Sequence, residues 1–384
     1  MKSAKKLEYL KKVKRVVIKI GSGVLASDDM QGTNEETLKR LVGDIVELEK
    51  DGRFEVVVVS SGSVMAGSRH LNLDQASLSI PMKQASAALG QVKLMTMYDA
   101  EFGKFDRAVS QILITHDDLS NRRRFLNARN AVSASLEMKV IPIINENDSV
   151  AVHEIKFGDN DTLAAVMTTV VDADLLLILS DVDGLYDSDP SKNDNAKMIS
   201  DIEEIDDSVR AIAGEGSSVT GIGGMKTKVI AAEKAAAYGV ATWIIGGKTT
   251  GSIAKALREG KGGTFFYPHG ERVANRKHWI AHVLKVKGEI VVDDGASEAI
   301  VKNGRSLLPS GIVEVVGNFE SGEAVSIRSK SGKEFARGLV KYHAVELKQI
   351  MGEKCSRIVD ILGYKASDEV IHRDDLVLVD KGEK

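Results

Sequence analysis

The chain has 384 residues, of which 43% are hydrophobic and 28% are charged, and its formal net charge is −3. This length and apolar content allow a sizeable core and favour two domains, while the near balance of charge argues against nucleic acid as a partner. The single cysteine, Cys355, excludes an intramolecular disulfide and a cysteine-rich zinc site, which fits a reducing, cytoplasmic setting.

The basic amino terminus lacks the apolar core of a secretory signal, and no apolar run in the chain reaches the length of a membrane span.

The first predicted strand ends in a glycine loop. Residues 15–20 predict a strand that leads into Gly21-Ser22-Gly23, where a phosphate can approach the backbone N–H groups. Lys19 is a charge within this apolar strand. It is either a functional cation or an edge-strand lysine that extends to water.

Strands and helices alternate after this loop. Strand 54–60 leads into Ser61-Gly62-Ser63, which either offers donors to a carboxylate or caps the next helix. The pattern then predicts helices over 35–50, 64–70, 83–105, 125–138, 162–171 and 252–259, an alanine-rich helix closed by Gly239, and strands over 108–114, 141–144, 175–180, 240–245 and 264–267. Such alternation predicts α/β architecture, with a mainly parallel central sheet in a three-layer αβα sandwich.

Residues 140–167 form the most informative stretch of the chain. Five carboxylates lie in or beside its two polar loops, at the carboxyl end of a predicted strand, where open α/β sheets bind ligands: Glu146, Asp148, Glu154, Asp159 and Asp161. These acids suit an ammonium group or Mg²⁺ and repel a phosphate unless a lysine or a metal intervenes. The alternative is an ordinary turn over 145–148, with Asp159 or Asn160 as the cap of a helix.

A second glycine-rich segment, residues 214–224, precedes the alanine-rich helix. Glycines at a helix N-terminus make a natural anion site, and Lys228 in the first turns can direct its ammonium back over the loop. The spacing is not that of a P-loop, and the alternative is a flexible glycine linker. Asp181 and Asp183 follow the apolar strand 175–180, where they either orient a metal or nucleotide or form an Asx turn.

From about Trp279 the pattern changes to short strands at glycine turns. Strands are predicted over 289–292, 312–316, 324–328, 335–339 and 376–379, which indicates a small β-rich domain. Residues 279–384 hold 16 Lys and Arg against 17 Asp and Glu, so this part has no basic excess with which to bind a phosphate backbone. We expect one domain over 1–269, a linker over 270–278 and a second domain over 279–384.

Taken together, these motifs resemble the glutamate 5-kinase family of the amino acid kinase superfamily. The resemblance rests on residues 19–22, 60–62, 144–148, 158–161, 181–186 and 221–228, which occur in the family's order over nearly the whole chain. Residues 292–296, 304–309 and 372–374 are similar to the PUA domain that many of these kinases carry. The resemblance implies the amino acid kinase fold followed by a small β-rich PUA-like domain.

The resemblance also assigns roles to individual positions. Lys19, Lys228 and Asp161 match catalytic positions, the aspartate organising the two lysines, while Ser61, Asp148 and Asn160 match positions that bind glutamate. The nucleotide-binding positions match Lys19, Ser180, Asp181, Ile222, Gly223, Gly224, Met225, Lys226, Thr227 and Lys228. One departure is Ile222, because the family's loop often has threonine there and this chain lacks that hydroxyl.

The activity that the resemblance implies is ATP-dependent phosphorylation of the side-chain carboxylate of L-glutamate, with Mg²⁺, in proline biosynthesis. It also implies feedback inhibition by proline and homo-oligomers, either dimers or tetramers. Because the chain ends after the β-rich domain, a separate glutamyl phosphate reductase is expected. No metal ligands are assigned.

Three alternatives remain at this stage. Another amino acid kinase would act on N-acetylglutamate, aspartate, carbamate or a nucleotide, and a glycine loop with two lysines does not separate these. PUA-like domains also occur in RNA-binding proteins, against which the charge balance argues. The assignment as a nicotinamide oxidoreductase rests only on residues 21–26, GSGVLA. A dinucleotide site requires an acidic residue that ends the next strand about twenty residues on, and this sequence predicts a helix over 35–50 there.

Overall fold

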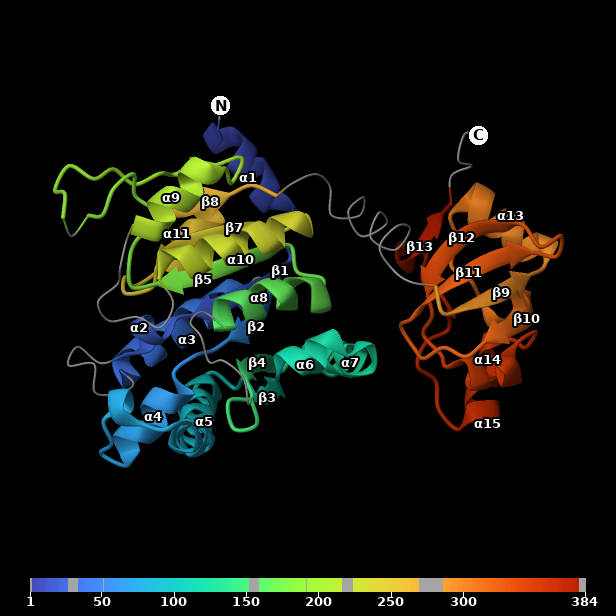
Figure 1. Ribbon diagram of the computed structural model, residues 1–384, viewed down its shortest axis with the longest axis horizontal. Coiled ribbons are helices and arrows are strands. Elements are labelled where there is room, and N and C mark those ends of the chain that lie inside the picture. The colour runs from blue at the N-terminus through green and yellow to red at the C-terminus, as the bar shows by residue number, and fades with distance from the viewer. Residues whose placement is uncertain are drawn as a thin grey trace. The chain divides into compact units, whose positions relative to one another are not determined.

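The computed structural model describes residues 2–26, 34–50, 52–151, 159–190, 192–215, 224–268 and 286–379. The chain divides into two compact units, one formed by residues 1–120 and 127–269 and the other by residues 121–126 and 270–384. Each unit has its own sheet (Figure 1). The linker predicted over 270–278 lies outside the described residues. Within the described ranges, no helix has both the length and the apolar character needed to cross a membrane.

The first unit is built on an eight-stranded sheet with the strand order β3-β4-β2-β1-β5-β7-β8-β6. The strands are β1 (Arg15–Ile20), β2 (Glu55–Val59), β3 (Val109–Ile114), β4 (Ile141–Glu146), β5 (Leu175–Ser180), β6 (Asp201–Ile202), β7 (Ala241–Gly246) and β8 (Thr264–Phe266). Every pairing from β3 to β7 is parallel, whereas β8 runs antiparallel to β7. The predicted, mainly parallel sheet is confirmed.

Helices cover both faces of this sheet. They are α1 (Lys2–Lys12), α2 (Ser22–Leu25), α3 (Glu35–Glu49), α4 (Ser63–His70), α5 (Ile80–Gly103), α6 (His116–Ser120), α7 (Arg122–Glu137), α8 (Asp159–Val170), α9 (Asp207–Glu215), α10 (Met225–Ala237) and α11 (Ser252–Glu259). Apolar residues of α1, α3, α5 and α11 share one core with one face of the sheet, while α8 and α10 pack against the strands and each other. This is the three-layer sandwich that the alternation predicts.

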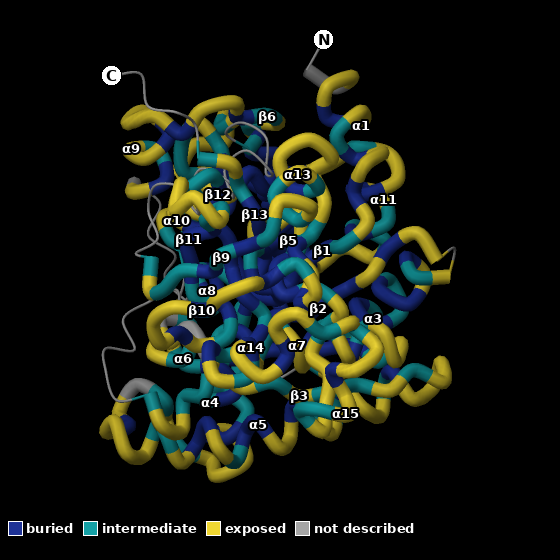
Figure 2. Tube along the Cα trace, turned by 90° about the vertical axis from the view of Figure 1, so that its right-hand side faces the viewer, coloured by how far each residue is buried: buried dark blue, intermediate teal, exposed yellow. Residues whose placement is uncertain are grey.

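Strand β1 lies at the centre of the sheet, between β2 and β5. Its residues are buried on both faces, as parallel strands between two helical layers should be, and Figure 2 shows the central strands in the colour of buried residues. The chain adds β2, β4 and β3 on one side of β1 and β5 and β7 on the other. The switch point, where such sheets bind ligands, is therefore at the carboxyl ends of β1 and β5.

The second unit contains a five-stranded sheet with the order β10-β9-β11-β12-β13. Its elements are β9 (Gly288–Val292), α13 (Asp294–Asn303), β10 (Ile312–Gly317), β11 (Ala324–Ser329), β12 (Glu334–Leu339), α14 (Ala344–Ile350), α15 (Ile358–Leu362) and β13 (Leu376–Leu378). A separate apolar core joins the strands to the helices. All five strands predicted in this part of the sequence are confirmed, whereas the helices described in it, α13, α14 and α15, were not predicted.

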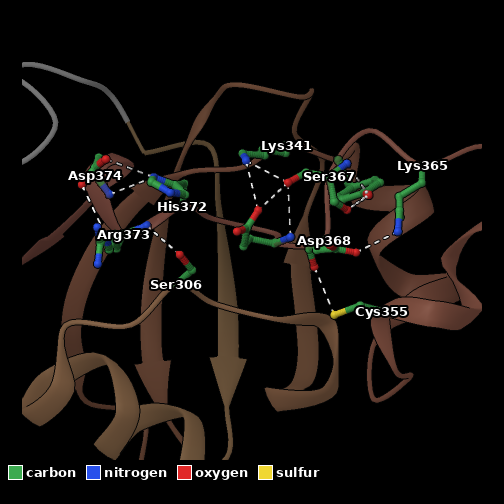
Figure 3. Close-up of polar contacts among 11 residues, drawn as sticks. Ser306, Lys341, Cys355, Lys365, Ser367, Asp368, His372, Arg373 and Asp374 are labelled. Atoms are coloured by element: carbon green, nitrogen blue, oxygen red, sulfur yellow. Dashed lines mark hydrogen bonds and ion pairs between the residues drawn. The ribbon is translucent and has the colours of Figure 1, made fainter. Parts of the chain in front are cut away.

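Polar side chains form hydrogen bonds within residues 365–374, the segment before β13, and connect this segment to Lys341 (Figure 3). The Lys341 ammonium donates to Ser367 Oγ at 2.8 Å and lies 3.3 Å from a carboxylate oxygen of Glu369. Lys365 donates to the Asp368 carboxylate at 2.8 Å. The cations in this region therefore face carboxylates of their own unit.

Helices α4 and α5 approach each other unusually closely. A Cβ built on Gly67 would lie 1.8 Å from the carbonyl oxygen of Ser86, and one built on Gly90 would lie 1.8 Å from the carbonyl oxygen of Ser63. Non-bonded carbon and oxygen atoms do not approach each other that closely, so only glycine at both positions permits this backbone contact.

The substitution Gly67→Ala is expected to lower the free energy of unfolding by about 1–3 kcal/mol or more, because its methyl group would overlap backbone atoms of α5. Gly43→Ala is the matched control, since no atom lies within 4 Å of a Cβ at this position in α3. The control should stabilise the helix by about 0.5–1 kcal/mol. Urea unfolding measures both, and equal effects of the two substitutions would contradict the packing argument.

Candidate active site

Three charged side chains meet at the carboxyl end of β1. The Lys19 ammonium lies 2.7 Å from Asp161 Oδ1, and the Lys228 ammonium lies 3.7 Å from Asp161 Oδ2. Asp161 is 0% exposed and each lysine is 5% exposed. We call these three residues the charge triad. Lys19 is therefore no edge-strand lysine, and that alternative is wrong.

Three elements bring the charge triad together. Lys19 is the fifth residue of the central strand β1, Asp161 lies in the first turn of α8, and Lys228 lies in the first turns of α10. The Thr227 hydroxyl adds a contact to Asp161 Oδ2 at 2.7 Å. One carboxylate thus holds side chains that are far apart in the sequence, and both ammonium groups are directed to the switch point.

The charge triad changes the protonation equilibria of its members. Burial alone would raise the pKa of Asp161, but the charges of Lys19 and Lys228 and hydrogen bonds from Lys19 and Thr227 outweigh it, so its pKa is lowered. Burial lowers the pKa of Lys228, and Lys19 adds to that effect while Asp161 opposes it. The site therefore holds an ionised aspartate and a lysine that releases its proton more readily than usual.

A second group of polar contacts lies at the ends of β2 and β4. Asn160 Nδ2 donates to Ser61 Oγ at 3.1 Å, and Ser63 Oγ donates to Asp148 Oδ2 at 2.8 Å. Asn160 precedes Asp161 on α8, so this group lies beside the charge triad. The Asn160 amide contacts a serine instead of capping the helix, and the N-cap of α4 is Gly62, not a serine. Neither cap interpretation holds for these side chains.

The end of β5 supplies the remaining described polar groups at this edge. Ser180 Oγ donates to Asp181 Oδ1 at 3.1 Å, and the Asp181 carboxylate lies 3.4 Å from the position of a Cβ on Gly23. The negative charge of Asp181 also acts on Lys228. Residues from the ends of β1, β2, β4 and β5 and from the first turns of α4, α8 and α10 thus converge on one edge of the sheet.

Of the second glycine-rich segment, residues 214–224, the structure describes Gly214 and Glu215 at the end of α9 and Gly224, which is the N-cap of α10. Met225 and Thr227 are half-buried and Lys226 is exposed. Two predicted nucleotide-binding residues, Ile222 and Gly223, lie outside the described residues, as does the acidic Glu154. The residues that are described place the start of α10 next to the charge triad, where backbone N–H groups suit an anion.

Comparison with known proteins identifies the family. Residues 14–246 match the model of the amino acid kinase family, and residues 288–362 match the PUA domain. A glutamate 5-kinase of Geobacter metallireducens is 49% identical over 370 residues, which cover 96% of this chain and 99% of that protein. The chain belongs to the glutamate 5-kinase family, within the amino acid kinases. A glutamate 5-kinase of Syntrophotalea carbinolica is 48% identical over 371 residues, covering 97% of this chain and 99% of that protein.

The family resemblance seen in the sequence is thus confirmed, as are the amino acid kinase fold and the PUA domain. The protein is a kinase. This gives the convergence of two lysines on one edge of the sheet a chemical meaning, because a kinase must offset the negative charge of a transferring phosphoryl group.

Sequence reasoning missed several polar residues that support this site. Ser63 was considered only as a cap or a donor to a ligand, and three residues of α5 were not singled out: Gln84, Gln91 and Tyr98. They bond to the backbone or side chains of the loops at the ends of β2 and β4. A spacing of seven residues between polar side chains on a packed helix was the available signal.

The substitution Asp161→Asn is expected to lower the free energy of unfolding by about 3–5 kcal/mol at pH 7, because it removes the buried carboxylate that both ammonium groups face. The pKa of Asp161 is lowered on folding, so its contribution is complete above the ordinary value of 3.8 and is lost as the pH falls through the lower folded value. Urea unfolding gives the difference in the free energy of unfolding between the wild type and the variant. This difference should be equal at pH 7 and pH 5 and smaller at pH 3. Wild-type stability of the variant at pH 7 would refute the argument.

Proposed function

We propose that the protein transfers the γ-phosphoryl group of ATP to the side-chain carboxylate of L-glutamate, giving L-glutamyl 5-phosphate at the start of proline biosynthesis. The observation that carries the proposal is the buried charge triad at the switch point, in a chain whose relatives in Geobacter metallireducens and Geobacter sulfurreducens are glutamate 5-kinases. A transfer between two anions needs fixed positive charge and alignment more than covalent chemistry.

On the donor side, Lys19 and Lys228 bind the β- and γ-phosphates and offset the charge of the phosphoryl group in transit. Asp161 keeps both ammonium groups at fixed positions through its two carboxylate oxygens. The backbone N–H groups at the start of α10 add donors for a phosphate. Ser180, Asp181 and the residues 222–227 complete the nucleotide site in this proposal.

On the acceptor side, Ser61, Asp148 and Asn160 bind glutamate. The Asn160 Oδ1 atom is buried and has no hydrogen-bond partner in the part of the chain that the structure describes, so it offers an acceptor to a ligand. Asp148 adds a carboxylate nearby, held by Ser63. An amide oxygen and a carboxylate suit the α-ammonium group of a free amino acid, which favours glutamate over its N-acylated form.

The chemical step requires no general base. The glutamate side chain has an ordinary pKa near 4.3 and is ionised at neutral pH. One of its carboxylate oxygens forms a bond to the γ-phosphorus while the bond from that phosphorus to the β,γ-bridging oxygen breaks, and ADP leaves with the electron pair. Because Asn160 and Asp161 are consecutive in α8, one turn of helix aligns the acceptor with the two lysines.

Mg²⁺ accompanies ATP in this proposal. Among the described residues, no group of three or more His, Cys, Asp and Glu side chains is arranged to hold a metal ion. Mg²⁺ is often held by one or two carboxylates together with substrate phosphates, and the exposed carboxylate of Asp181 beside Gly23 fits that arrangement. When bound, the ion would neutralise part of the phosphate charge.

The same proposal includes three properties of the pathway enzyme. Proline acts as a feedback inhibitor at or near the glutamate site, the chain forms dimers or tetramers, and a separate glutamyl phosphate reductase consumes the acyl phosphate. It also places the protein in the cytoplasm.

An ATP-dependent assay in hydroxylamine tests the reaction, because hydroxylamine converts an acyl phosphate to a coloured hydroxamate. The wild type should give a signal with L-glutamate, lowered by proline, and little signal with N-acetylglutamate or L-aspartate. Equal or better activity with N-acetylglutamate would overturn the assignment of the acceptor. Silence with all three acids, with ATP binding intact, would overturn the proposed reaction.

The substitution Lys228→Ala should reduce kcat about 100-fold or more, because the transferring phosphoryl group loses one of its two ammonium partners. Lys234→Ala is the matched control, since it removes an equal charge from an exposed position further along α10 and should leave kcat within twofold of the wild type. The hydroxamate assay at saturating ATP and glutamate measures both variants. Near-normal turnover of Lys228→Ala would refute the role of this lysine.

The pH dependence of kcat/KM for ATP should show the lowered pKa of Lys228, because this ratio reports groups of the free enzyme. The protonated amine binds the phosphates, so kcat/KM falls as the pH rises through that pKa, and the descending limb lies below the ordinary lysine value of 10.5. In Lys228→Arg the cation keeps its proton over the whole range, so the remaining activity should lack this limb. Profiles of kcat/KM for ATP between pH 7 and 10.5 make the comparison, and identical limbs in both proteins would contradict the assignment.

A further inference from the structure

Helix α5 presents three polar side chains to the loops at the ends of β2 and β4. They are Gln84, Gln91 and Tyr98, which we call the α5 polar line. Seven residues make nearly two helical turns, so the three side chains lie along one face of the helix, with about 10 Å between successive positions. The line therefore runs along α5 instead of around it.

Each member of the line bonds to a different point of these loops. Gln84 Nε2 donates to the carbonyl oxygen of Ala151 at 3.1 Å, three residues after Asp148. Gln91 Oε1 accepts from Asn145 Nδ2 at 2.8 Å, near the end of β4. Tyr98 and Ser60 share a hydrogen bond of 3.0 Å between their oxygens, next to Ser61.

Two of these contacts lie deep in the protein. Gln91 is 7% exposed, and Asn145 and Tyr98 are 0% exposed. A buried polar group that loses its hydrogen-bond partner lowers the free energy of unfolding. The other amide atom of Asn145, Oδ1, accepts the backbone N–H of Glu146 at 2.9 Å. The buried amide pair thus orients the chain where it leaves β4. Burial raises the pKa of Tyr98 to about 12, so its hydroxyl keeps its proton at neutral pH.

The contact between α4 and α5 also helps to position Asp148. A Cβ on Gly90, the neighbour of Gln91, would lie 1.8 Å from the carbonyl oxygen of Ser63, so the two backbones are in direct contact. Ser63 in turn donates to the Asp148 carboxylate. Helix α5 therefore sets the position of Asp148 both through the loop ends and through α4.

We propose that the α5 polar line positions the glutamate-binding loops, so that Gln84, Gln91 and Tyr98 are positioning residues for the acceptor and not for the nucleotide. This inference rests on the proposed function. The hydrogen bonds described for the three side chains reach the ends of β2 and β4, which carry Ser61 and Asp148. The charge triad and the start of α10 are held by other contacts.

The variants Gln84→Ala and Tyr98→Phe test the two ends of the line. Each removes one hydrogen bond to an acceptor loop, so each should raise KM for glutamate on the order of fivefold, with kcat and KM for ATP within twofold of the wild type. The ratio of kcat/KM for glutamate to that for glutarate, which lacks the α-ammonium group, should fall by a similar factor. Thr96→Ala is the control, because this exposed hydroxyl of α5 bonds to the carbonyl oxygen of Val92 in its own helix.

The outcomes separate the two proposals. If the wild type forms no hydroxamate from glutamate, the proposed function fails and this inference fails with it. If the wild type is active but Gln84→Ala and Tyr98→Phe leave KM for glutamate unchanged, only the positioning role is overturned. It is also overturned if the variants raise KM for glutamate and ATP equally, or lower the melting temperature in proportion to their loss of activity, because both results indicate a general structural defect.

Discussion

The ion pair between Lys19 and Asp161 is the constraint on which this site depends. A lysine in the central strand of a buried parallel sheet is stable as a cation only beside a counterion. Asp161 provides it at 2.7 Å from the first turn of α8, and its second oxygen faces Lys228 of α10. The need to neutralise one buried charge therefore places both helices and the second lysine at the switch point of the sheet.

In the proposed reaction, the acceptor side is held differently from the donor side. The donor side relies on charge in a buried setting, where small displacements change interaction energies greatly. The acceptor loops rely on hydrogen bonds from uncharged side chains of α4 and α5, two helices whose backbones touch at Gly67 and Gly90. Helix α8 joins the two sides, because Asn160 contacts Ser61 while Asp161 contacts Lys19. In the proposed reaction, a single helical turn thus sets how the acceptor carboxylate faces the two lysines.

Local patterns in the sequence gave most of the first unit's architecture. Strand β1 matches its predicted range and β5 does too, because β-branched and apolar runs bounded by glycine or aspartate indicate buried strands. The antiparallel pairing of β8 and the short helices α2 and α6 were not predicted, since strand direction depends on how a connection crosses the sheet and short helices carry little periodic signal.

The sequence by itself determined the family, the order of strands and helices, and the residue types at the site, because these depend on motifs and on periodicities over a few residues. Only the tertiary structure decided that Lys19 lies on the central strand, and it gave the contacts of Asp161 with Lys19 and Lys228 that the resemblance had implied. It also decided that Gln84, Gln91 and Tyr98 bond to residues at and beyond the ends of β2 and β4. These contacts join residues far apart in the chain, and they depend on strand order, on parallel register and on the close approach of two helices, which no local pattern encodes.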